Sequence, residues 1–350
     1  SYAHMNDKAI QIGSGYKRDN FSLKLNTKPT KRTTLDFQAR YSDIDVKGGG
    51  AQDAAGAYDT DRRLKYSVIY TPIPLANLDS SAGAADDDFG NLYNPVEAQY
   101  DNDKRTEKKT LNIAAAFGWE IIDNLRLKTE FGYDDFNQYD KRFFGLTTYY
   151  VKNVPASDNQ NMPAIRLIDT NRHRFRSTNT VNYDFKKILK SDDHSLNLLV
   201  GHEYVITKKR TNTNESHGFP TDFDADMAWK LTSQGTPYMI DDVYSADDKL
   251  LSFFGRANYN YKDKYLFSAT FRADASSKFA SNNRWGYFPS AAIAWRISSE
   301  PFMKTTKSWL DDLKLRLSYG TAGNNNIPVG QLSQMYELKT SSWVNDFTSF

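Results

Sequence analysis

Strand-length segments in which apolar and polar residues alternate constrain this chain more than any other feature. From Tyr265 to Asp274, aromatic and alanine side chains occupy every odd position, and the even positions from 268 on are Ser268, Thr270, Arg272 and Asp274. A period of two indicates a strand whose two sides meet different surroundings. The same alternation runs from Leu111 to Trp119 and from Leu125 to Tyr133. Its recurrence predicts a wall with an apolar medium on one side and water on the other.

The composition favours a wall over a filled core. Hydrophobic residues make up only 39% of the 350 residues, yet tyrosines and phenylalanines number 22 and 21. A transmembrane barrel needs only an apolar skin and two aromatic girdles. No apolar run approaches the roughly 18 residues of a spanning helix, so any membrane crossing must use strands. The absence of cysteine excludes disulfides and thiol chemistry, and a net charge of +2 does not indicate a nucleic-acid partner.

The pattern predicts eleven strands and one short helix. The helix is Pro301 to Leu310. The strands are Asn20 to Lys28, Thr33 to Val46, Arg63 to Thr71, Lys109 to Ile122, Asn124 to Gln138, Arg174 to Phe185, Ser195 to Lys208, Leu250 to Tyr261, Lys264 to Ser276, Arg284 to Ile297 and Leu313 to Thr321. Tight turns alternate with long polar connections, as the periplasmic turns and external loops of bacterial barrels do. We therefore expect an antiparallel up-and-down transmembrane β-barrel.

Strand direction predicts one further strand. If the turns at residues 27–31 and 122–124 lie on the same side, then Arg63 to Thr71 and Lys109 to Ile122 both run inward. Two consecutive inward strands cannot occur in a meander, so we expect an outward strand within Tyr93 to Asp103. This brings the predicted number of strands to twelve, or thirteen if Ser1 to Met5 closes a preceding strand.

The alternation also assigns faces. Leu23, Leu25, Phe37 and Tyr259 would face outward, with Trp119, Trp285 and Trp295 as interface aromatics. Arg40 and a larger basic set would face inward. A charge on the lipid face near mid-membrane costs about 2 to 4 kcal/mol, so this face must be wet or packed on protein. The inward, lumen-wall candidates are Arg126, Lys128, Arg256, Arg272, Asp274, Arg296 and Arg316.

Several runs resemble the barrel signature of SusC/RagA-type TonB-dependent outer-membrane transporters. They are Lys264 to Phe279, Asn283 to Ser290, Ala294 to Ile297, Glu300 to Phe302, Leu313 to Gly320 with Gly323-Asn324, and the early run Gly15 to Ser22. These runs lie near both ends of the chain and occur in the family's order. The resemblance implies a multi-pass barrel in the outer membrane of Bacteroidota-type bacteria.

The resemblance also implies a function and partners. Members import oligosaccharides, and some import peptides, through a barrel of about 22 strands that is blocked by a plug. A SusD-like lipoprotein covers the outer face, and the TonB complex supplies energy through the plug. Residues 1–350 would be a portion of this barrel, because no plug or TonB box is recognisable in them. Basic wall residues would then pair with carboxylates of the plug, although lining a substrate path stays an alternative.

Loop aromatics are the candidates for substrate contact, because sugar rings stack on flat side chains. They are Tyr149, Tyr150, Trp229, Tyr238, Trp343 and Phe347, for which packing against other loops or the lid is the alternative. Asp222, Asp224 and Asp226 have the spacing of calcium ligands, but Met227 and Ser233 replace the glycine and glutamate of an EF-type loop. We therefore predict no metal, no cofactor and no catalytic residue.

Two other functions fit the alternating strands. One is a soluble or surface-attached β-rich glycan-binding protein without transport activity, whose polar face would simply meet water. The other is a structural adhesin barrel, which would have no plug. Partition into water without detergent would support the first of these over an importer.

Overall fold

The computed structural model describes residues 1–10, 12–48, 96, 100–148, 150–151, 157–185 and 193–327, with the backbone of 339–340 and 348–349. Most of these residues belong to one antiparallel sheet. Its strands are β1 (Tyr2–Lys8), β2 (Gly15–Thr30), β3 (Thr33–Lys47), β4 (Lys104–Ile122), β5 (Leu125–Phe144), β6 (Ala164–Asp184), β7 (His194–His217), β8 (Thr236–Tyr244), β9 (Asp248–Tyr261), β10 (Tyr265–Ser276), β11 (Trp285–Arg296) and β12 (Lys314–Gly320).

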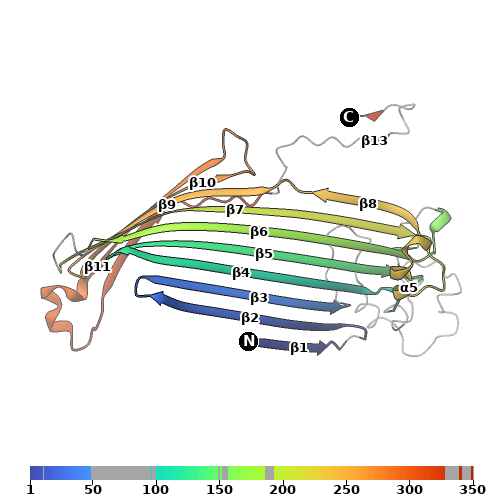
Figure 1. The fold of residues 1–350 in the computed structure, drawn as a ribbon, viewed down its shortest axis with the longest axis horizontal. Coiled ribbons are helices and arrows are strands. Elements are labelled where there is room, and N and C mark those ends of the chain that lie inside the picture. The colour runs from blue at the N-terminus through green and yellow to red at the C-terminus, as the bar shows by residue number, and fades with distance from the viewer. Residues whose placement is uncertain are drawn as a thin grey trace.

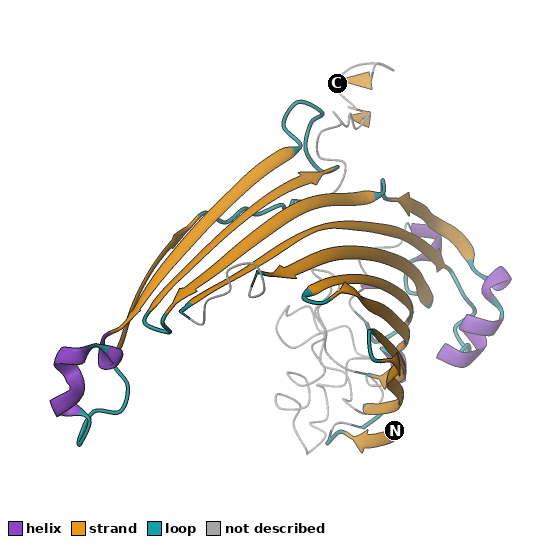
Figure 2. Cartoon of the chain, turned by 60° about the vertical axis from the view of Figure 1, so that its left-hand side comes forward, coloured by secondary structure: helices purple, strands orange, loops and turns teal. Residues whose placement is uncertain are grey.

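The strands follow one another in chain order from β1 to β12, and only β8 leaves this path. Strand β7 is long enough for two partners, since His194 to Thr207 pair with β9 and Arg210 to His217 pair with β8. The sheet is open and curved, with β1 at one edge and β12 at the other (Figures 1 and 2). A further pair, β13 (Lys339–Thr340) and β14 (Thr348–Ser349), forms a separate two-stranded sheet. The all-β, antiparallel, incomplete-barrel prediction is confirmed.

The two ends of the sheet differ, as a barrel that faces two compartments requires. At the turn end, β2 and β3, β4 and β5, and β9 and β10 are joined by two or three residues. Asn124 and the pair Lys262 and Asp263 adopt positive φ there, as tight hairpin turns demand. The loop end carries β8 and the helix α5 (Ala225–Lys230) (Figure 1).

Strict alternation of short and long connections is not observed. The β11–β12 connection spans residues 297–313 at the turn end and contains two 3-10 helices, η4 (Ile297–Ser299) and η5 (Pro301–Thr306). The helix that we predicted from Pro301 to Leu310 is thus shorter and of 3-10 type. Thr305 and Thr306, both β-branched, are poor helix formers, which fits its end there. Among the residues that the structure describes, no helix is long and apolar enough to cross a membrane.

Glu300 fastens this turn-end connection to the sheet. Its carboxylate accepts hydrogen bonds from the Tyr265 hydroxyl at 2.7 Å and from Trp295 Nε1 and Lys264 Nζ, both at 3.1 Å. The hydrogen bond from Tyr265, followed by those from Trp295 and Lys264, holds the pKa of Glu300 below its usual range. The charged carboxylate therefore stabilises this end of the sheet.

The additional strand that we predicted within Tyr93 to Asp103 is wrong. Strand β3 pairs directly with β4 in an unbroken register from Thr33 opposite Trp119 to Lys47 opposite Arg105. No position remains between them for another strand of the sheet, and the described residues 100–103 contain no strand. The predicted strand Arg63 to Thr71, which created the apparent conflict of directions, lies outside the described residues. The meander is satisfied because β3 and β4 are consecutive.

The register places the alternating residues in rows across the sheet. One face carries apolar rows, such as Leu25, Phe37, Ala115 and Phe131. We call this the apolar face; its members include Leu23, Phe117, Trp119, Phe253, Phe271, Ile293 and Leu317, all between 40% and 67% exposed. Such exposure of large apolar side chains is what a lipid-facing surface requires. The opposite, polar face carries the arginines, lysines and acids.

The buried core lies at the loop end and not along the wall. Phe143, Ile165 and Phe219 are at most 2% exposed and pack with Ala225 and Ala228 of α5. This helix lies on β5 and β6 (Figure 1). Its N-terminus is capped by Asp224, whose carboxylate accepts from the Met227 amide at 2.7 Å. A small buried apolar core, of the kind found in water-soluble proteins, therefore stabilises the loop end of these strands.

Candidate functional site

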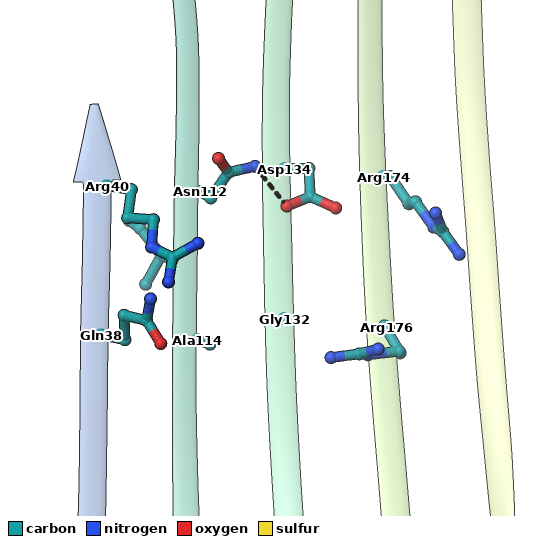
Figure 3. Close-up of a pocket in the computed structure, with 9 residues that line it drawn as sticks. Gln38, Arg40, Asn112, Ala114, Gly132, Asp134, Arg174 and Arg176 are labelled. Carbon is teal, nitrogen blue, oxygen red and sulfur yellow. Dashed lines mark hydrogen bonds between the residues drawn. The ribbon is translucent and has the colours of Figure 1, made fainter. Parts of the chain in front are cut away.

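The polar face contains a hollow of about 370 Å³ that spans β3, β4, β5 and β6. It is built from two neighbouring rows of the register. The row nearer the loop end is Arg40, Asn112, Asp134 and Arg174, and the next row is Gln38, Ala114, Gly132 and Arg176. Figure 3 shows these side chains on the four strands. We call this the polar-face hollow.

Small residues form the floor of the polar-face hollow, and arginines reach in from both sides. Arg40 and Arg176 extend toward one another across Ala114 and Gly132, whereas Arg174 extends the other way, toward the next strand (Figure 3). A Cβ atom added at Gly132 would lie 3.6 Å from Nε of Arg176 and 3.7 Å from its Nη2. The guanidinium of Arg176 therefore lies flat over the bare backbone of β5.

The charges of the polar-face hollow do not balance. Among the residues that the structure describes, three arginines line it and Asp134 is the only acid. Asp134 accepts a hydrogen bond from Asn112 Nδ2 at 2.7 Å and forms no ion pair within the described part of the chain. Arg40, Arg174 and Arg176 likewise have no carboxylate partner among the described residues. The hollow is consequently a basic depression on the polar face.

Arg272 shows the opposite arrangement further along the same face. Its Nε lies 2.8 Å from Asp274 Oδ1, and its Nη2 lies 3.4 Å from Glu203 Oε1 and 2.9 Å from the hydroxyl of the buried Ser252. Its guanidinium also covers the ring of Phe254 at 5.6 Å. Here the wall supplies the counter-charges itself, so Arg272 and Asp274 form a wall ion pair.

The other predicted lumen-wall residues are spread over the turn half of the sheet. Arg126 and Arg256 fall in one row, with Arg256 Nε 3.3 Å from Thr270 Oγ1. Lys128 pairs with Glu130 at 2.7 Å. Arg296 lies 3.6 Å from Asp312 at the turn end, and Arg316 is exposed on the edge strand β12. Sequence reasoning placed Arg40 on the polar face but missed Arg174 and Arg176.

The loop-end aromatics have different surroundings. Tyr150 is only 4% exposed, stacks on Phe144 at 4.1 Å and donates to the buried Glu215. Trp229 is half-buried beneath the Arg105 guanidinium, at 4.7 Å. Tyr238 is 54% exposed and stacks on His217 at 4.0 Å. Tyr149, Trp343 and Phe347 lie outside the described residues.

Asp224 and Asp226, two of the three acids with the spacing of calcium ligands, have protein partners. Asp224 caps α5, and Asp226 pairs with Arg105 Nη1 at 2.8 Å. Within the described ranges, no group of three or more histidine or acidic residues is arranged to hold a metal ion. Sequence reasoning treated this connection as an acidic loop and did not anticipate α5 or β8.

Comparison with known proteins identifies the kind of wall that these strands build. Residues 51–345 match the family described as TonB dependent receptor-like, beta-barrel. This chain belongs to that family. As a TonB-dependent receptor barrel it lies in the bacterial outer membrane, so the apolar face meets lipid and the polar face lies inside the barrel. The predicted family, localisation and fold class are confirmed.

Relatives of this TonB-dependent receptor come from Formosa agariphila and Bacteroides thetaiotaomicron. TonB-dependent receptor P3 of the former is 30% identical over 264 residues, covering 74% of this chain and 24% of the relative. TonB-dependent receptor SusC of the latter is 26% identical over 333 residues, covering 91% and 30%. The chain thus spans 24% and 30% of these two TonB-dependent receptors.

A solved structure shows the same fold. The RagAB peptide transporter superposes with a TM-score of 0.73 at 22% identity, covering 96% of this chain and 36% of that chain. A similarity at this identity supports the barrel architecture alone. The curved sheet of Figures 1 and 2 is therefore part of a TonB-dependent barrel wall.

Proposed function

We propose that this chain forms part of the barrel of an outer-membrane importer of oligosaccharide or peptide nutrients, energised through TonB. One observation carries the proposal: an antiparallel wall with an apolar face for lipid and a polar face lined with bases, in a family of TonB-dependent receptors. Such a wall encloses an aqueous interior large enough to hold a plug or a solute. The protein acts by binding and passage and has no enzymatic role.

The proposal includes two partners and a plug. A SusD-like lipoprotein covers the loop end, and the TonB complex acts through a plug encoded elsewhere in the same reading frame. Similarity to SusC and to the RagAB peptide transporter supports this arrangement. The share of each relative that this chain covers, 24% to 36%, leaves ample length for a plug and the remaining strands.

Tyr238 is the best placed of the described substrate-contact candidates. Its ring is exposed at the loop end and is held rigidly by stacking on His217, which is itself 1% exposed. A fixed, accessible aromatic ring suits the C–H face of a sugar or an apolar peptide side chain. Tyr150 supports this surface from beneath through Glu215, to which His217 also binds at 2.8 Å. The basic polar face would contact the plug.

Uptake by intact cells tests the proposal. Cells lacking the gene are complemented with the full reading frame and given fluorescent oligosaccharide or peptide pools, with and without a protonophore. An importer depletes the medium only when the proton gradient is present. Two results together would favour the glycan-binding alternative and refute import. The cells would bind the oligosaccharide equally with and without the protonophore, and the protein would be extracted into water without detergent.

A further inference from the structure

The polar-face hollow combines an excess of positive charge with a shape that a small group can enter. Arg40, Arg174 and Arg176 face one acid, Asp134, so its lining carries a net charge of +2. Arg174 and Arg176 are two residues apart on one face, about 7 Å along β6, and so repel one another. A barrel interior screens this repulsion less well than open water. A negatively charged partner would therefore be bound favourably in the polar-face hollow.

Geometry places that partner between Arg40 and Arg176. Strands β3 and β6 are three strand spacings apart, about 14 Å, and the two side chains extend toward one another across this gap (Figure 3). Ala114 and Gly132 occupy the two strands between them, so no side chain of the described residues fills the space. Guanidinium groups bind carboxylate and phosphate oxygens with directed, charge-assisted hydrogen bonds.

The polar groups around Arg40 and Arg176 do not neutralise the charges of these two arginines. Turned with its oxygen toward Arg40, the Gln38 amide accepts from Nε and Nη2 at 2.5 and 2.6 Å, which orients the guanidinium without neutralising it. Asp134 is held by Asn112, and Glu130, in the next row toward the turn end, is already paired with Lys128. Lys24, opposite Gln38, adds another positive charge.

We propose that the hollow between Arg40 and Arg176 is a binding site for an oxyanion, a carboxylate or phosphate-type group. The group is carried either by another segment of the full-length protein or by a solute inside the barrel. The site stands on the described charges and contacts and does not depend on import activity.

Zero-length crosslinking of the full-length protein in detergent tests the site. Arg176→Lys keeps the charge and supplies an amine, which a carbodiimide joins only to a carboxylate in contact with it. The chain offers a matched control, Arg126→Lys, on the same face but outside the hollow. If a protein segment occupies the site, mass spectrometry finds a crosslink from position 176 to a carboxylate that does not belong to the strands of the wall. If a solute does, added isotope-labelled succinate gives an adduct at position 176 that inorganic phosphate competes away.

Removing the second arginine distinguishes a two-sided site from a single reactive amine. Adding Arg40→Met to Arg176→Lys should lower the yield of either product about tenfold, because one charge-assisted hydrogen bond is lost. Three results would overturn the proposal: a crosslink to Asp134 or Glu130 of the wall, an equal yield from Arg126→Lys, or no product at either position in protein that still migrates as a folded barrel. Arg40→Lys replaces Arg176→Lys if the latter does not fold.

Discussion

Two neighbouring alanines in the middle of β4 give the sharpest test of the two-faced wall. Ala115 lies on the apolar face between Phe37 and Phe131, halfway along the run from Leu111 to Trp119. This run of eight steps is about 27 Å long, which a strand tilt of about 40° reduces to about 21 Å of membrane height. Ala116 lies on the polar face, directly between Asp36 and Glu130. Arginine at the two positions should therefore change stability by very different amounts.

We expect Ala115→Arg to destabilise the folded barrel by about 2 to 4 kcal/mol, the cost of a guanidinium near the bilayer midplane. This corresponds to a loss of about 30-fold to about 900-fold in the folding equilibrium. Ala116→Arg should change stability by less than about 1 kcal/mol, because it meets two carboxylates in a wet interior. Guanidinium unfolding of the full-length protein in lipid vesicles, followed by the mobility shift of folded barrels on unheated gels, measures both.

The reasoning fails if the two variants lose stability equally, or if Ala116→Arg loses more. Equal losses would mean that both faces are packed on protein, and the reverse order would mean that the assignment of the faces is inverted. Repeating the comparison in vesicles with longer lipid chains provides a control, since the apolar-face penalty depends on depth in the bilayer and the polar-face effect does not.

Three further predictions concern single positions. Gly201→Ala should destabilise by about 1 to 3 kcal/mol, because its Cβ would lie 2.8 Å from the Asn179 carbonyl oxygen, whereas Gly255→Ala, whose Cβ would lie 3.7 Å from its nearest neighbour, should be tolerated in the same unfolding assay. Glu300→Gln should destabilise the folded barrel at neutral pH. The difference between the unfolding midpoints of the variant and the wild type should shrink as pH falls below about 4. The pKa of Glu300 is lowered in the folded protein, so the stability that its carboxylate contributes is lost when it is protonated. Glu215→Ala should remove the buried carboxylate that lies 2.7 Å from Arg166 Nε, costing about 3 kcal/mol locally, and should speed proteolysis between β7 and β8 without releasing the barrel from the membrane.

The sequence pattern predicted the strands correctly where the two faces of the wall meet different media. It did not predict the strand segments where the faces do not. Strands β6 and β7 extend about ten residues beyond their predicted ends, to Ala164 and His217. Beyond the membrane neither face meets lipid and part of the sheet is covered by α5, so alternation disappears while backbone pairing continues. The strand β8 was missed for the same reason, since Met239 and Ile240 are adjacent and acids follow them. Pairing between backbones has no signature in side-chain polarity.

The polar-face hollow could not be predicted because it depends on register across long connections. The tight turn after Ile122 allows Ala114 to be matched with Gly132 by counting. Gly132 meets Arg176 across the connection from residue 145 to 163, and Gln38 meets Ala114 across residues 48–103. No count along the sequence gives the alignment of strands joined in this way. The face on which each residue lies could therefore be predicted, but the residues beside it on the neighbouring strands could not.

Arg176 and Arg272 lie on the same polar face, yet the wall treats their charges differently. Arg272 is paired with Asp274 and Glu203 and hydrogen-bonded to Ser252, so Arg272→Met would leave two half-buried acids 2.8 and 3.4 Å from the vacated positions without a counter-charge. We expect it to destabilise the barrel by about 1 to 2 kcal/mol. Arg176→Met removes a charge that no described carboxylate balances, so it should leave stability unchanged or slightly higher if a solute, and not a segment of the protein, occupies the polar-face hollow. Equal destabilisation by the two variants in vesicle unfolding would mean that Arg176 is as fully paired in the folded protein as Arg272. A carboxylate from another part of the full-length protein would then pair with Arg176 permanently.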